Sequence, residues 1–209
     1  MLLESTTAKI AYVSGLTLFL TSLGCWAVLG HQESLPVSSE AQAAMTDLAF
    51  AKDAARGGLA EIKLGKLAED SGSSQAVKTF GTRMVDEHTK AGDKLKEAAA
   101  LEHIALPTDL AAKDQASLDK LSKLSGADFD RAYAQEMLED HQQDLRAFQR
   151  EANGGHDAAI RGFASQTLPI IQQHWEQAKE MLKSVSSTSS RRTNGSMGRP
   201  PARGHYNNG

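Results

Sequence analysis

Residues 77–98 read VKTFGTRMVDEHTKAGDKLKEA. The apolar side chains of this stretch recur every three or four residues, as they do along one face of an α-helix, at Val77, Phe80, Met84, Ala91, Leu95 and Ala98. Ser73 or Ser74 can cap the N-terminus, and Pro107 disfavours helix before it. The stretch therefore predicts a long amphipathic helix over about residues 74–103.

Three further stretches show the same spacing and predict helices over about residues 45–70, 128–152 and 157–183. In the first of them the expected core stripe is Leu48, Ala51, Ala55, Leu59 and Ile62. Three glycines in that helix, Gly57, Gly58 and Gly65, suggest close helix–helix approach, room for a ligand, or a locally weak helix. Pro169 should kink the last helix, or mark a fresh start capped by Thr167.

Composition agrees with an all-α fold, because the chain has 31 alanines and 23 leucines against 12 valines and isoleucines together. We expect a four-helix bundle with a short extra helix near residues 109–124, in the connector between the second and third long helices. That connector is long enough for a crossover along the bundle, although an up-down-up-down order is also open. A net charge of −3 argues against a nucleic-acid partner, and one cysteine excludes an intramolecular disulfide framework.

The segments outside the bundle suggest export. Residues 1–30 contain the uncharged run Ile10–Leu29, which suits either a signal peptide or an N-terminal membrane anchor. A lipoprotein box at Ser22–Cys25 is a weaker alternative. Residues 31–44 resemble a linker, 45–183 form the bundle domain, and the Ser-, Gly- and Arg-rich residues 184–209 should be disordered. We therefore expect a periplasmic or cell-envelope location, with a membrane tether through residues 10–29 or an envelope protein as partner.

Each apolar stripe is interrupted by one polar residue that would face the interior: Glu61, His88, His141 and His174. Unpaired polar groups are costly to bury, and a metal ion would offset that cost. Three imidazoles and one carboxylate suit a single ion such as zinc, copper, iron or manganese. Neighbouring carboxylates, which are Asp86, Glu87, Glu139 and Asp140, are candidates for supporting ligands.

Helix geometry leaves the assembly of this site open. The expected offsets along the helix axes are about 7–10 Å, so the four residues form either one site or two separate pairs. A purely structural polar core and a pH sensor are the alternatives to a metal site. The chain has no glycine-rich phosphate loop, GxSxG elbow or HExxH motif, which favours a binding or interaction protein over an enzyme.

The chain resembles a family of bacterial exported proteins that share domain of unknown function 4142. The resemblance lies in five stretches of the predicted bundle, AEIKLGKLAED (60–70), VKTFGTRMVDEHTK (77–90), Leu106–Pro107, FDRAYAQEMLEDHQQDLRAFQREA (129–152) and FASQTLPIIQQHWEQA (163–178). It implies a ferritin-like four-helix bundle in the periplasm or outer membrane, and no assigned activity. Glu-x-x-His motifs of di-iron ferritins are missing, since the residues three before the histidines are Val85, Leu138 and Ile171.

Overall fold

The computed structural model describes residues 39–195, and these residues contain helices and no strands. The helices are α1 (Ser39–Ser71), α2 (Gln75–Leu101), α3 (Ala112–Leu121), α4 (Gly126–Gly154) and α5 (Ala158–Gly195). The sequence prediction of four long helices and one short one is confirmed. None of the described helices is both long and apolar enough to span a bilayer.

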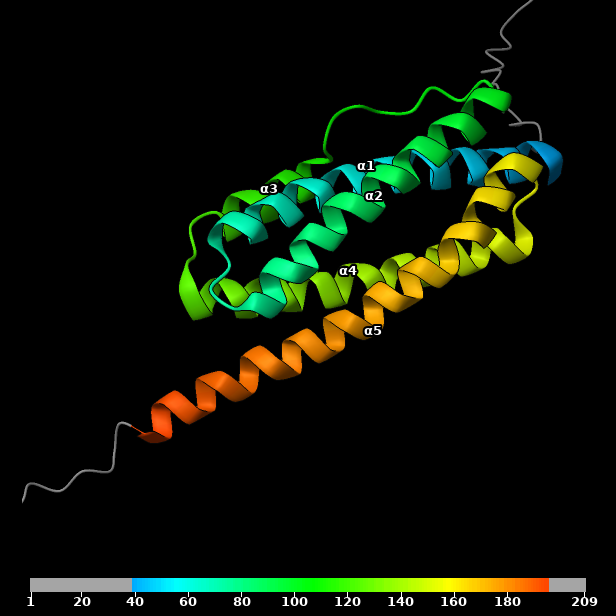
Figure 1. Ribbon diagram of the computed structural model, residues 1–209. Coiled ribbons are helices and arrows are strands. Elements are labelled where there is room, and N and C mark those ends of the chain that lie inside the picture. The colour runs from blue at the N-terminus through cyan, green and yellow to red at the C-terminus, as the bar shows by residue number, and fades with distance from the viewer. Residues whose placement is uncertain (1–38, 196–209) are drawn as a thin grey trace, which may run out of the picture. The chain divides into compact units, whose positions relative to one another are not determined.

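Two helix bounds differ from the expectation. α1 begins at Ser39, inside the segment expected to be a linker, and α5 continues past Lys183 to Gly195, into the segment expected to be disordered. α5 also runs through Pro169 as one helix, without a fresh start at Thr167. Figure 1 shows α5 changing direction in its yellow N-terminal part, which agrees with the predicted kink because proline removes one backbone hydrogen bond. The segment 1–30 lies outside the described residues.

The turn between α1 and α2 is fastened to the start of α4. The Asp130 carboxylate accepts hydrogen bonds from the backbone N–H groups of Ser73 and Ser74, both at 2.8 Å, and from the Ser73 hydroxyl at 2.6 Å. Ser74 caps α2 by accepting a hydrogen bond from the N–H of Val77. α2 and α4 therefore begin at the same end of the bundle.

The opposite end of the bundle is also held by carboxylates. Asp47 of α1 accepts a hydrogen bond from the backbone N–H of Asp157 at 2.5 Å, and Asp157 in turn caps α5 through the N–H groups of Ala159 and Ile160. Glu151 is buried beside them, and burial together with the charges of Asp47 and Asp157 raises the pKa of Glu151 to about 7.

These contacts determine the helix order. α1 and α5 begin at one end of the bundle, whereas α2 and α4 begin at the other end. The connector after α2 must therefore run back along the bundle, and Figure 1 shows this green segment returning from the end of α2 to α3. Of the two connections that the sequence left open, the structure has the crossover.

The core consists of two apolar clusters. The first includes Leu64, Val77, Phe80, Met84, Phe129, Tyr133, Met137, Ala178 and Met181. The second includes Ala51, Leu95, Phe148, Ile160, Phe163 and Ile171. Each long helix contributes residues to both clusters, and buried polar side chains interrupt the apolar sequence between them.

Candidate metal centre

The four predicted residues occupy equivalent places on the four long helices. Each is buried between one residue of the first apolar cluster and one of the second: Glu61 between Leu64 and Ala51, His88 between Met84 and Leu95, His141 between Met137 and Phe148, and His174 between Ala178 and Ile171. The amphipathic pattern thus carries all four side chains into the same layer of the core. The structure brings the three histidines within reach of one ion and places Glu61 against His88 and His141, so the four residues do not form two separate pairs.

His141 and His174 face each other through one ring nitrogen each. His141 Nε2 lies 3.3 Å from His174 Nδ1. The remaining nitrogen of His141, Nδ1, is 2.8 Å from the Met137 carbonyl, which can only accept, so Nδ1 carries the proton. The remaining nitrogen of His174, Nε2, is 2.6 Å from the Glu87 carboxylate and donates to it. In the neutral rings, the two facing nitrogens are therefore both lone-pair acceptors.

Burial keeps these two imidazoles neutral. It lowers the pKa of His141, and burial together with the nearby His141 and His88 lowers the pKa of His174 to about 4. Two lone pairs that face each other repel unless a cation lies between them. The distance of 3.3 Å is also what a tetrahedral site requires, because two ligands with metal–nitrogen bonds of about 2.0–2.1 Å lie about 3.3–3.4 Å apart.

Glu61 and His88 complete the layer. The Glu61 carboxylate forms an ion pair with His88 Nε2, and its other oxygen lies 3.4 Å from His141 Nδ1. Even so, both Glu61 oxygens and His88 Nε2 are buried without a hydrogen bond of proper geometry to any described residue. Buried polar atoms are rarely left in this state, and a cation bound between them would satisfy them.

Charge also concentrates in this pair. Burial alone would raise the pKa of Glu61, but His141, His88 and His174 outweigh it and lower that pKa to about 2. Burial likewise opposes a charged His88, yet the Glu61 carboxylate raises the pKa of His88 above its ordinary value. A carboxylate is therefore kept ionised in the protein interior, where a cation would be bound most strongly.

The three imidazoles are close enough for one ion. One ring nitrogen from each of His88, His141 and His174 can be chosen so that all three atoms lie within 4.8 Å of one another. The ring centroids are 5.2–5.9 Å apart. Phe80 of the first apolar cluster packs edge-on against His141 and His174 and borders the site on that side.

The neighbouring carboxylates behave differently from one another. Of the four proposed as supporting ligands, Glu87 binds a histidine, whereas Asp86 and Glu139 are exposed. Burial and the charge of Glu61 raise the pKa of Asp140 to about 7. The same causes raise the pKa of Asp144 to about 8. Asp144 was not predicted, although its position three residues after His141 places it on the same side of α4.

Comparison with known proteins identifies the family. The sequence model described as "Domain of unknown function (DUF4142)" matches residues 32–181, which include the whole four-residue layer. The chain belongs to the DUF4142 family. No curated protein and no solved structure matches it. The predicted resemblance to DUF4142 is thus confirmed, and the function of this DUF4142 protein has to be argued from its own residues.

Proposed function

We propose that this protein binds one transition-metal ion in the bundle core, with His88, His141 and His174 as nitrogen ligands and Glu61 as the oxygen ligand. The observation that carries the proposal is the pair of facing nitrogens of His141 and His174. The other ring nitrogen of each histidine donates a hydrogen bond, to the Met137 carbonyl or to Glu87. The lone pairs of the two facing nitrogens are therefore directed at a shared point.

The hydrogen-bond partners of His141 and His174 support the same interpretation. A metal-bound histidine commonly donates its other N–H to a carboxylate or a backbone carbonyl, which fixes the ring and its tautomer. Glu87 supplies the carboxylate for His174, and the Met137 carbonyl does the same for His141. An imidazole-rich set with one carboxylate favours zinc, copper or iron over manganese.

The proposal is one of binding rather than catalysis. A crossover connection agrees with a ferritin-like bundle, but the missing Glu-x-x-His motifs leave no ligand set for a carboxylate-bridged pair of irons. We propose that the protein holds its ion for buffering or sensing. We also propose that it does so in the periplasm or cell envelope, since the apolar run of residues 10–29 directs export in either of its interpretations.

The test is metal analysis of the full chain, purified without chelators or a metal-affinity tag. We expect one ion per chain in the wild type and its loss in His141→Gln and His174→Gln. Two exposed histidines provide matched controls, because His103→Gln and His156→Gln should retain the ion. Circular dichroism of each variant separates loss of the ligand from loss of the fold.

A titration with Co²⁺ completes the test, because tetrahedrally bound Co²⁺ absorbs visible light strongly. Saturation at one equivalent supports the site. A wild-type chain that neither retains an ion nor binds added Co²⁺, Zn²⁺ or Cu²⁺ would refute it. In that case the layer is a structural polar core, and the search turns to envelope proteins that contact the bundle. The ion pair of Glu61 with His88 is the observation that favours this second function.

A further inference from the structure

A cavity of about 290 Å³ lies next to the proposed metal centre. Residues of α1, α2, α4 and α5 line it, together with Pro107 and Thr108 of the connector. For comparison, an engineered cavity of roughly 150 Å³ lined by apolar side chains binds benzene. The space is therefore large enough for an aromatic molecule with substituents.

Helical glycines produce this space. Gly57 and Gly92 line the cavity, and a Cβ atom added at either would have no neighbour within 4 Å. Gly58 also lines it, and an added Cβ would meet the Nδ1 atom of His88 at 3.9 Å. Glycine destabilises a helix interior relative to alanine, and at these positions no close neighbour would clash with a larger side chain. We attribute the three glycines to the space that they leave in the cavity.

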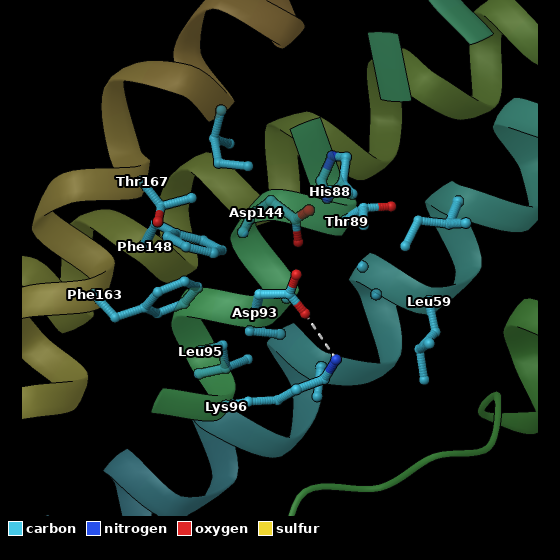
Figure 2. Close-up of a pocket in the computed structure, with 18 of the residues that line it drawn as sticks. Leu59, His88, Thr89, Asp93, Leu95, Lys96, Asp144, Phe148, Phe163 and Thr167 are labelled. Carbon is cyan, nitrogen blue, oxygen red and sulfur yellow. Dashed lines mark hydrogen bonds and ion pairs between the residues drawn. The ribbon is translucent and has the colours of Figure 1, made fainter. Parts of the chain in front are cut away.

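The cavity has apolar walls and one polar end. The rings of Phe148 and Phe163 lie 5.8 Å apart with a tilt of 54°, and Leu95 is buried beside them. His88 and Asp144 supply the polar end. Asp144 forms no hydrogen bond or ion pair with the described part of the chain, apart from longer-range electrostatic interactions. Figure 2 shows these residues around the space, with the Asp93–Lys96 ion pair near the exposed edge.

The lining selects the kind of molecule that fits this end. A charged group would be costly to bury, because most of the walls are apolar. A neutral hydroxyl can both donate and accept a hydrogen bond, so it can pair with the carboxyl group of Asp144 and with the ring of His88.

We infer that this cavity binds a small neutral aromatic alcohol of the phenol class, with its ring against Phe148 and Phe163 and its hydroxyl at Asp144 and His88. The inference needs the cavity and not the metal, so it can succeed or fail independently of the proposed metal site. The test therefore uses the full chain after treatment with a chelator, and the probe is p-cresol.

Calorimetric titration should give saturable binding of one p-cresol per chain. Toluene, which lacks only the hydroxyl, should bind at least about 5–10-fold more weakly, as the loss of the two hydrogen bonds of the hydroxyl predicts. Asp144→Leu should reduce the preference for p-cresol over toluene. Gly58→Leu and Gly92→Leu should each weaken binding of both probes at least about tenfold, since a leucine side chain fills the space.

Gly162→Leu is the matched control for the filling variants. Gly162 is a half-buried helical glycine with no neighbour within 4 Å of an added Cβ, and it does not line the cavity. The affinity of Gly162→Leu for p-cresol should equal that of the wild type. Absence of saturable p-cresol binding overturns the inference, as does binding that both filling variants leave unchanged. Equal affinity for toluene and p-cresol overturns the role of the hydroxyl.

Discussion

Replacing Gly65 by alanine tests whether the close approach of α1 and α2 positions the metal centre. A Cβ added at Gly65 would lie 2.7 Å from the carbonyl oxygen of Gly81, and one added at Gly81 would lie 2.6 Å from the carbonyl oxygen of Gly65. The two helices thus meet backbone to backbone. To restore ordinary contact, they must separate locally by about 0.5–1 Å.

The size of the effect follows from two opposing terms. Overpacking of this kind costs typically about 1–3 kcal/mol. Glycine to alanine in a helix interior gains about 1 kcal/mol. Gly57→Ala has the gain without the clash, because nothing lies within 4 Å of its added Cβ. The free energy of unfolding of Gly65→Ala should therefore fall about 1–3 kcal/mol below that of Gly57→Ala.

Urea denaturation of the full chain, followed by circular dichroism without metal, measures this difference. A second measurement addresses function, because Glu61 lies one helical turn from Gly65. Because α1 is displaced in Gly65→Ala, this variant should bind the metal more weakly than the wild type. Gly57→Ala has no such displacement, so its metal affinity should stay close to that of the wild type. Equal stability of the two alanine variants would refute the steric argument.

Three further predictions concern single carboxylates. Glu87→Gln should weaken metal binding about 10–100-fold with the fold unchanged, because it removes the charged acceptor of the His174 N–H; metal titration checks this, and an unchanged affinity contradicts it. Asp130→Ala should destabilise the protein by about 2–4 kcal/mol, since three hydrogen bonds from the α1–α2 turn lose their acceptor; a urea midpoint like that of the wild type contradicts it. The raised pKa of Glu151 means that its contribution to stability is full at low pH and is lost as pH rises from about 4.5 to about 7. Glu151→Gln should therefore raise the Tm at pH 8 and not at pH 4. A Tm shift that is the same at both pH values contradicts this prediction.

The meeting of the four site residues illustrates what sequence spacing can and cannot decide. Counted in residues from the turns, Glu61 and His88 differ in depth by about 7 Å. However, Cβ atoms point toward the N-terminus of their own helix. In an antiparallel pair, this moves Glu61 away from the turn and His88 toward it, which reduces the offset. The same holds for His141 and His174, so backbone depth alone overestimated the separation.

The core face of α1 was predicted only in part from its sequence, with Ala51 and Glu61 buried as expected. The expected stripe included Leu59 and Ile62, which are only half-buried, whereas Ala60, Leu64 and Ala68 are buried. α1 is rich in alanine and glycine and has apolar residues on more than one side, so periodicity does not choose between faces. Packing against α2 decides the question, because the tightest contact needs glycine and alanine rather than large side chains.

The same crossing explains why the cavity adjoins the metal centre. The helices touch at Gly65 and Gly81, and straight helices that cross diverge with distance from the crossing. His88 lies about 10 Å beyond Gly81 along α2, and Gly92 about 16 Å. Gly57 lies about 12 Å before Gly65 on the antiparallel α1, on the same side. The widening gap first holds the polar layer and then, where glycines replace side chains, the cavity. Widening the crossing through Gly65→Ala should therefore disturb metal and p-cresol binding together, whereas Gly92→Leu should weaken p-cresol binding and leave the metal in place.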